Sequence, residues 1–262
     1  MNIVVCVKQV PDTNEVKIDE EKGTLIREGV PSIINPEDKT AIEEAVKLKE
    51  EFGGQVTVIS MGPPQAKDAL IEAYAIGADQ AILLSDKKFA GSDTWATAYT
   101  LSQAIKEVGD FDLIFCGRQA IDGDTAQVGP QVAENLDISQ ITYVRELNIE
   151  GDKVTAKRKL EEGYSIIETE LPVLLTVLGD LNKPRYPSIK RIVDAFNDEN
   201  TVKVWNADDF VVDDDKLGLD ASPTQVYDTF VPTRDHEPEI LEGTVEEKVG
   251  KLIDKLKEEK VV

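Results

Sequence analysis

Short apolar runs alternate with helical patterns along the first half of the chain. Residues 3–8, 55–61, 80–84 and 112–117 are continuous apolar runs rather than alternating ones. Continuous runs of this length are typical of parallel strands whose two faces are both covered. The pattern therefore predicts four buried parallel strands.

Helix start and stop signals stand between these runs. Asn35 and Pro36 open one helical pattern, a second covers residues 64–76 and stops at Gly77, and a third begins near residues 92–93. A fourth is predicted to begin at Asp124. Strands that alternate with helices predict an α/β fold with a doubly wound, mostly parallel, Rossmann-like sheet of the adenine-nucleotide-binding type.

The pattern changes after about residue 140. Residues 141–148, 153–160, 165–170 and 173–178 are strand-like and are joined by short turns, which predicts an antiparallel extension of the sheet. From about residue 182 the chain is acidic, rich in proline and irregular, until a helical pattern returns at 244–259.

We therefore expect a nucleotide-binding domain over residues 1–182. Residues 183–262 are expected to form a docking loop and an extended C-terminal arm that wraps a partner. A disordered acidic tail is the alternative, although Trp205, Phe210, Tyr227 and Phe230 favour some burial.

The charge balance excludes two classes of partner. Fifty-one acidic residues against 29 basic ones give a formal net charge of −22, which repels nucleic acid and anionic lipid, although solubility alone explains most of the acidity. No apolar run approaches the roughly 20 residues that span a bilayer, and the N-terminus begins as a strand rather than a signal peptide. These features predict a cytoplasmic protein without membrane insertion.

The composition offers few groups for direct catalysis. Cys6 and Cys116 each lie inside an apolar strand pattern, which favours buried structural thiols, and His236 is the single histidine. We therefore expect no metal site and no catalytic side chain, and any chemistry should be carried by a bound cofactor.

Ligands of doubly wound sheets bind at the carboxyl ends of the strands, so the residues that follow each strand are the candidates. Lys8 follows the first strand, and Asn35 and Asp38 at the next helix start could hold an adenine or ribose edge; simple helix capping is the alternative. Thr94 and Thr97 open the third helix, where free N–H groups could bind phosphate or the residues could merely cap the helix.

The densest polar stretch follows the fourth strand, at residues 117–130. It combines glycines, amide and hydroxyl side chains, and Arg118 beside a predicted helix start. This combination suits a dinucleotide pyrophosphate and an electron-rich ring. Neither the glycine-rich dinucleotide fingerprint nor the P-loop occurs in the chain.

At these residues the chain closely resembles the electron-transferring flavoprotein beta subunit family. The resemblance covers nearly the whole chain, and the matching blocks are residues 5–12, 35–45, 77–79, 117–122, 158–163, 171–173 and 182–187. One departure, Tyr164-Ser165 after an acidic-glycine turn, lies away from the nucleotide loops.

The resemblance implies a heterodimer whose alpha subunit carries an FAD that exchanges electrons with an acyl-CoA dehydrogenase. The beta subunit of housekeeping members holds a structural AMP, whereas electron-bifurcating members hold a second FAD that NADH reduces. Residues 122–130, with Gly123 leaving room for an isoalloxazine, together with Thr94 and Thr97, resemble the bifurcating group. FAD with NADH is therefore the favoured hypothesis and AMP the alternative.

The resemblance also assigns residues to two sites. The cofactor-binding residues that it implies are Cys6, Lys8, Asn35, Asp38, Met61, Thr94, Thr97, Gly117, Arg118, Gln119, Ala120, Ile121, Asp122, Gly123, Asp124, Thr125, Ala126, Gln127 and Val128. The residues implied to dock on the dehydrogenase are Arg185, Tyr186, Ile189 and Arg191, with Ile189 as an exposed aliphatic anchor or, alternatively, an ordinary core residue.

The expected activity is oxidoreduction that occurs only in the complex, with ferredoxin or flavodoxin as the low-potential acceptor. A universal-stress-type nucleotide sensor and an ATP-splitting enzyme of similar fold are the alternatives from other classes. The sensor would not need the C-terminal arm, and the enzyme would want a phosphate loop that this chain lacks.

Overall fold

The computed structural model describes residues 1–12, 17–19, 24–26, 31–198, 201–228 and 239–261. These residues form two compact units, Met1–Tyr227 and Asp228–Val262. The first unit thus ends later than residue 182, where the sequence pattern changes. Phe230 and His236 lie outside the described residues.

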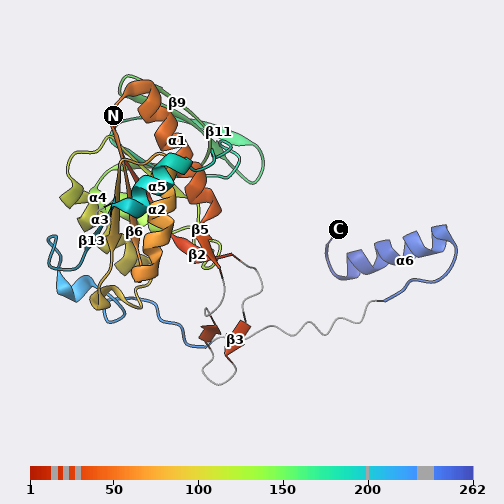
Figure 1. Ribbon diagram of the computed structural model, residues 1–262. Coiled ribbons are helices and arrows are strands. Elements are labelled where there is room, and N and C mark those ends of the chain that lie inside the picture. Colours follow the sequence, from red (N-terminus) through yellow and green to blue (C-terminus); the bar gives the residue numbers. More distant parts are fainter. Residues whose placement is uncertain (13–16, 20–23, 27–30, 199–200, 229–238, 262) are drawn as a thin grey trace. The chain divides into compact units, whose positions relative to one another are not determined.

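A central sheet runs through the first unit (Figure 1). It has nine strands in the order β11-β10-β9-β12-β8-β1-β6-β7-β13. Its strands are β1 (Asn2–Cys6), β6 (Gln55–Met61), β7 (Gln80–Leu84), β8 (Leu113–Gly117), β9 (Ser139–Glu150), β10 (Lys153–Lys159), β11 (Tyr164–Glu170), β12 (Val173–Val177) and β13 (Val202–Trp205). β1 lies between β6 and β8 and pairs with both in parallel, and the four strands predicted first all belong to this parallel core. The doubly wound α/β fold is confirmed.

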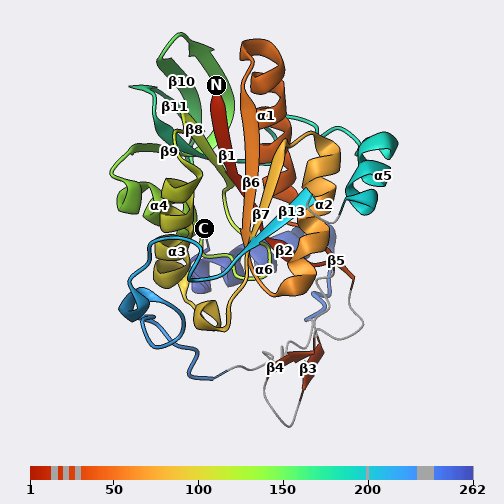
Figure 2. The same ribbon diagram turned by 60° about the vertical axis from the view of Figure 1, so that its left-hand side comes forward.

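Helices cover both faces of the sheet. α1 (Pro36–Phe52) and α2 (Lys67–Ile76) pack on one face, and α3 (Thr94–Val108) and α4 (Val128–Leu136) pack on the other (Figure 2). Side chains alternate along β1, so Ile3 and Val5 join the first core while Val4 and Cys6 join the second. This two-sided burial explains why the strands are apolar throughout.

The antiparallel extension is confirmed for three strands and wrong for the fourth. β9, β10 and β11 form an antiparallel set at one edge. β12, predicted within that set, instead pairs in parallel with β8 and with the first part of β9. All five β12 residues are buried, between α1 and α4, because β12 is a central strand.

Two elements beyond residue 182 belong to the first unit and were not predicted. α5 (Ile189–Asn197) packs on α2, and β13 adds a parallel edge strand beside β7. Both are short, and β13 exposes its two middle residues, so neither carries a long apolar signal. Phe210 packs against Phe89 and Trp205, which confirms that part of this region is buried.

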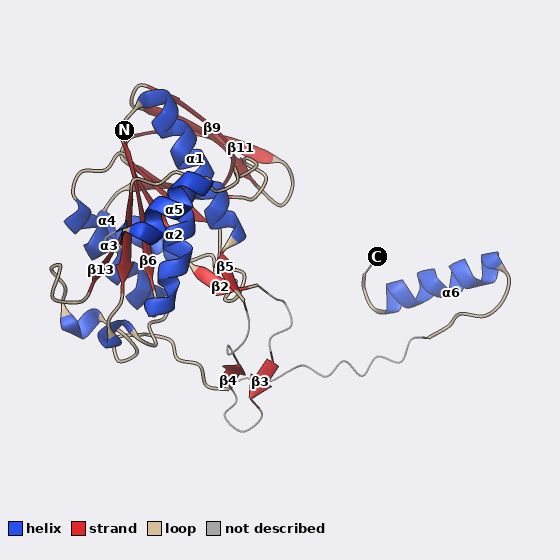
Figure 3. Cartoon of the chain, in the orientation of Figure 1, coloured by secondary structure: helices blue, strands red, loops and turns tan. Residues whose placement is uncertain are grey.

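Figure 3 colours the smaller elements by type. Among the described residues, β2 (Gln9–Pro11) pairs with β5 (Ser32–Ile34), and β3 (Lys17–Asp19) pairs with β4 (Thr24–Ile26). Short 3₁₀ turns are described at Pro64–Ala66, Lys87–Phe89 and Asp214–Lys216. Among the described residues, no helix is long and apolar enough to cross a membrane.

The described residues of the second unit include the helix α6 (Val245–Glu258). Thr244 and Glu247 form a capping box at its start, which confirms the helix predicted over residues 244–259. Its apolar residues Val245, Val249, Leu252 and Ile253 are all exposed on this chain.

Candidate functional site

The candidate site lies where the sheet reverses its winding. From β1 the chain passes to α1 on one face, whereas from the neighbouring β8 it passes to α4 on the other face. The loops after these two strands therefore diverge at one edge of the sheet. Crevices of this kind are where open α/β sheets bind their ligands.

Asn35 and Asp38 connect the loops at this edge. The buried Asp38 carboxylate accepts hydrogen bonds from Lys8 N (2.8 Å), Gly117 N (3.0 Å) and Asn35 Nδ2 (3.0 Å). Asn35 occupies the N-cap position of α1 but makes no side-chain cap bond. It donates to Gln119 O at 2.9 Å and accepts from Ile121 N at 3.1 Å. The capping alternative is therefore wrong for the Asn35 side chain, which instead shapes the loop after β8.

Burial raises the pKa of Asp38 to about 7, although the hydrogen bonds from Asn35, Lys8 and Gly117 act in the opposite direction. The carboxylate is committed to protein donors, so it orders the backbone around the site. A role in contacting a ligand edge directly stays a prediction.

The loop over residues 118–127 is held at its middle and at its end by contacts from two other segments. Lys8 Nζ pairs with Asp122 at 2.7 Å, which joins the end of β1 to the middle of the loop. Thr94 Oγ1 donates to Gln127 at 3.1 Å, which joins the start of α3 to the end of the loop. The predicted cofactor residues of three loops thus come together at one edge of the sheet.

The fourth helix begins at Val128 rather than at the predicted Asp124. Asp124 and Ala126 have φ values of 48° and 53°, in the left-handed region that ends or prevents a right-handed helix. The polar residues before Val128 therefore form an open loop, and α4 begins without a side-chain cap. Its first N–H groups are the type of donor that binds phosphate at a helix start.

The Arg118 side chain is only partly exposed and forms an ion pair with Glu37. Its buried Nε lies 3.4 Å from Glu37 Oε2, where it forms an ion pair but no hydrogen bond, and Gln119 N donates to the same oxygen. Burial raises the pKa of Glu37, against the effect of the Arg118 charge. Glu37 was missed as a site residue, although its place between Asn35 and Asp38 was the available signal.

Three glycines of this region differ in the space around them. A Cβ on Gly117 would overlap Asp38 Oδ1, and one on Gly129 would press on Thr176 and Cys116. A Cβ on Gly123 would meet no atom within 4 Å. Gly117 and Gly129 are therefore required by close packing, whereas Gly123 borders open space. Gly129 is a second residue that sequence reasoning did not select.

Cys6 and Cys116 are neighbours in register on β1 and β8, and both are buried free thiols. Their mutual hydrogen bond and their burial raise the pKa of Cys116 well above its usual range. The prediction of buried structural thiols is confirmed.

The remaining predicted cofactor residues lie at or near the same edge. Met61 ends β6 beside β1, and Thr97 lies in the first turn of α3. Ala120 O accepts hydrogen bonds from Gly123 N and Asp124 N within the turn. Gln119 Nε2 donates to the Asp124 carboxylate at 2.6 Å. Thr125 is exposed, and Val128 is partly buried at the start of α4.

The predicted docking segment divides into anchors and exposed residues. Arg185 binds Glu43 at 2.8 Å and Glu50 at 2.6 Å, both on α1, and Arg191 donates to Tyr74 O and Ala78 O. The two arginines therefore hold the segment on the body of the protein.

Tyr186 and Ile189 are 92% and 80% exposed, so the alternative that Ile189 is a core residue is wrong. Val193 and Phe196, one and two turns further along α5, are also exposed and extend this apolar surface. Sequence reasoning missed both because it did not predict α5.

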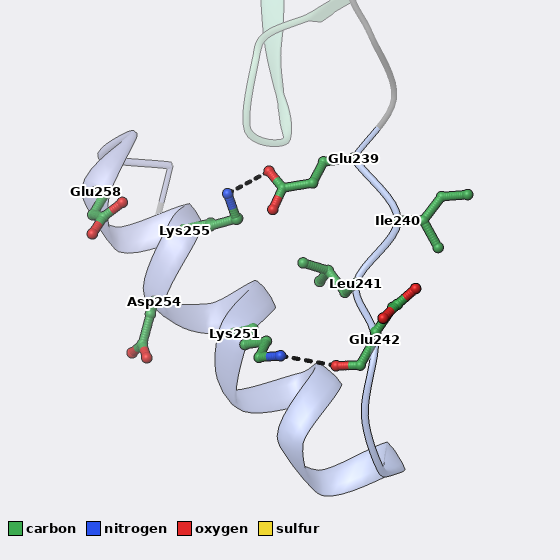
Figure 4. A pocket seen from close by; sticks show the side chains of 8 residues that line it. All are labelled: Glu239, Ile240, Leu241, Glu242, Lys251, Asp254, Lys255 and Glu258. Atoms are coloured by element: carbon green, nitrogen blue, oxygen red, sulfur yellow. Dashed lines mark hydrogen bonds and ion pairs between the residues drawn. The ribbon is translucent and has the colours of Figure 1, made fainter.

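A groove in the second unit holds none of the predicted cofactor residues (Figure 4). It runs between residues 239–242 and α6, and Lys255–Glu239 (2.5 Å) and Lys251–Glu242 O (2.9 Å) hold its two sides together. Its lining is mostly charged, which does not suit a flavin ring.

Comparisons with known proteins show which family the chain belongs to. A beta subunit of electron transfer flavoprotein from Thermoanaerobacterium thermosaccharolyticum is 58% identical over the whole of both chains. Subunit CarD of the caffeyl-CoA reductase-Etf complex from Acetobacterium woodii is 51% identical, again over 100% of each chain. The electron transfer subunit gamma of acryloyl-CoA reductase from Anaerotignum propionicum is 47% identical over 100% of both. The family model described as the electron transfer flavoprotein domain matches residues 22–209, so the chain belongs to the electron transfer flavoprotein family and resembles its beta subunits throughout.

Proposed function

We propose that this chain is the beta subunit of an electron-bifurcating flavoprotein and that it binds an FAD at the edge formed by β1, β8 and α4. The observation that carries the proposal is the loop over residues 118–127. It is polar, borders open space at Gly123, and leads into a helix without a side-chain cap. Relatives whose names place them in caffeyl-CoA and acryloyl-CoA reductase complexes support the assignment.

The residues of the site suit a dinucleotide. The first N–H groups of α4 would face the pyrophosphate, and the open space at Gly123 leaves room for a large ring. The chemistry that a bound FAD supplies is acceptance of a hydride from NADH and separate release of two electrons, one to ferredoxin or flavodoxin and one, through the alpha-subunit FAD, to an acyl-CoA dehydrogenase. The chain's own residues hold, orient and electrostatically tune the cofactor.

Arg118 is the candidate for tuning. It stands at the start of the loop and its present partner is Glu37 at 3.4 Å, an imperfect pairing that leaves the guanidinium able to face an anionic ring. Arg118→Gln should lower the reduction potential of the flavin bound here, because a positive charge favours the reduced, anionic form. Unchanged potentials in an otherwise intact complex would exclude this role.

The proposed partners match two exposed apolar surfaces. The α6 stripe of the second unit would be covered by the alpha subunit, in the manner of an amphipathic helix on a groove. Tyr186 and Ile189 would dock on the dehydrogenase from a segment that Arg185 and Arg191 hold in place. We place this activity in the cytoplasm and assign the oxidoreduction to the complex rather than to this chain alone.

A structural AMP is the second candidate ligand. The adenine, ribose and phosphate of AMP would use the same loops, so the uncapped start of α4 does not distinguish the two ligands. The open space at Gly123 favours FAD, because AMP would leave that space unused.

The decisive functional test is coupled electron transfer by the purified complex of this chain with its alpha subunit and dehydrogenase. With NADH as donor, ferredoxin should be reduced only while an α,β-unsaturated acyl-CoA is also present as the acceptor, since each hydride must release one electron to each branch. Ferredoxin reduction that proceeds without the second acceptor, or that never occurs while the acyl-CoA acceptor is reduced, would contradict bifurcation.

A further inference from the structure

Asp38 occupies an unusual position for a buried acid, because donors from three separate segments converge on it. Lys8 N follows β1, Gly117 N ends β8, and Asn35 Nδ2 precedes α1. The strands that Asp38 joins are the two whose loops form the candidate site. The carboxylate is therefore one of the contacts that set the distance between those loops, together with the pairing of β1 with β8 and the Lys8–Asp122 ion pair.

The packing leaves this carboxylate little freedom. The backbone of Gly117 lies so close to Asp38 that even a methyl group would overlap Oδ1. Asn35 in turn holds Gln119 O and Ile121 N, so the arrangement extends into the loop over residues 118–127.

Each of the three donors presents a proton to Asp38, so the arrangement matches a carboxylate, which only accepts. Asn35 Nδ2 and Gly117 N donate to Oδ1 and Lys8 N donates to Oδ2, so one lone-pair site of the carboxylate is left for a proton. Protonation would remove the negative charge that strengthens all three bonds and would therefore weaken them. We propose that Asp38 is a positioning residue whose carboxylate holds the ends of β1 and β8 in the nucleotide-binding arrangement, and whose protonation releases them and lowers nucleotide affinity.

The surrounding charges place this protonation in an accessible range. Burial favours the protonated form most strongly and Glu37, the neighbouring acid on α1, adds to it; together they raise the pKa of Asp38 to about 7 against its hydrogen bonds. Cys6 and Cys116 lie on the two strands beside it, and the Asp38 charge helps to keep the Cys116 thiol protonated. Two cations of the adjoining loops pair with other acids, Lys8 Nζ with Asp122 and Arg118 with Glu37.

This inference rests on the proposed function only in that a nucleotide binds at this edge. The test is the dissociation constant of FAD for the full chain in complex with its alpha subunit, with this site emptied beforehand, measured from about pH 5.5 to about pH 8.5. FAD suits this purpose because its pyrophosphate keeps the same charge across that range. Affinity should fall as the pH decreases through the Asp38 transition, by up to about tenfold per pH unit below it.

Three variants make the assignment specific. Asp38→Asn should abolish the pH step. Asn35→Ala, which removes one donor to the carboxylate, should move the step to higher pH. Asp79→Asn is the matched control. Asp79 also accepts a hydrogen bond from a strand N–H, that of Val56, but at the end of the sheet where the parallel strands begin. The pH step of Asp79→Asn should therefore match that of the unmodified chain.

A flat profile in the unmodified chain, or a step that survives in Asp38→Asn, would overturn the proposal. If Asp38→Asn does not fold, an unmoved step in Asn35→Ala has the same consequence. Failure of FAD to bind at every pH would refute the FAD assignment instead; the same comparison of variants with AMP as the probe would then decide the role of Asp38.

Discussion

Replacement of Gly117 by alanine is the sharpest structural perturbation of the site. The added Cβ would overlap Asp38 Oδ1 and lie 3.0 Å from both Asp38 N and Glu37 C, so the neighbours that must move are a buried side chain and helix backbone. Overpacking of this kind costs about 1–3 kcal/mol, and loss of the bond from Gly117 N to the carboxylate adds about 1.5–3 kcal/mol. We therefore expect Gly117→Ala to lower the free energy of unfolding by about 2.5–6 kcal/mol, a large share of the total for a typical domain.

Gly123→Ala is the matched control, six residues further along the same loop. Its Cβ would meet no atom within 4 Å, and the backbone there has no left-handed φ, so its effect should stay within about 0.5 kcal/mol. The assay is urea denaturation of both variants, without added nucleotide, followed by circular dichroism and tryptophan fluorescence. Equal midpoints for Gly117→Ala and the unmodified chain would refute the close approach of Gly117 to Asp38.

Three further predictions concern other parts of the first unit. Arg185→Ala leaves the buried Glu43 without its bidentate partner and should lower the free energy of unfolding by about 1–3 kcal/mol, measured by the urea midpoint; no change would contradict the anchoring role of Arg185. Ile189→Ser should leave the midpoint unchanged because the side chain is 80% exposed, yet slow electron transfer to the dehydrogenase; an unchanged rate would remove Ile189 from the docking surface. Because the pKa of Asp38 is raised on folding, its contribution to the free energy of unfolding is complete below the ordinary carboxyl range near 4 and is lost as the pH rises through about 7. Subtracting the pH profile of the free energy of unfolding of Asp38→Asn from that of the unmodified chain should isolate this loss. Parallel profiles of the two proteins would contradict it.

The parallel core was predictable because its signal is local and long. β6 and β7 begin and end at the predicted residues, since both faces of a central parallel strand demand apolar side chains. The strand over residues 173–178 was predicted, but its direction was not. A five-residue apolar run has the same pattern in a parallel or an antiparallel pair, and its partner β8 lies more than fifty residues away in the chain.

The site was predictable as a set of loops but not as a set of contacts. Residues after β1 and β8 were selected because strand ends converge, and Lys8 does pair with Asp122. The left-handed φ values of Asp124 and Ala126, which delay α4, have no strong sequence signal, because neither residue is glycine. Asn35 resembles a helix cap in sequence, and only the position of the loop after β8 shows that its side chain is used there instead.

The nucleotide content of the intact complex tests the central claim most directly. This chain should be purified together with its alpha subunit, and the nucleotides released on denaturation should be quantified against protein. The proposal predicts two FAD and no AMP in each heterodimer, one FAD from each subunit. One FAD and one AMP would contradict it, and would mean that the loop around Gly123 holds a structural nucleotide in an ordinary electron carrier.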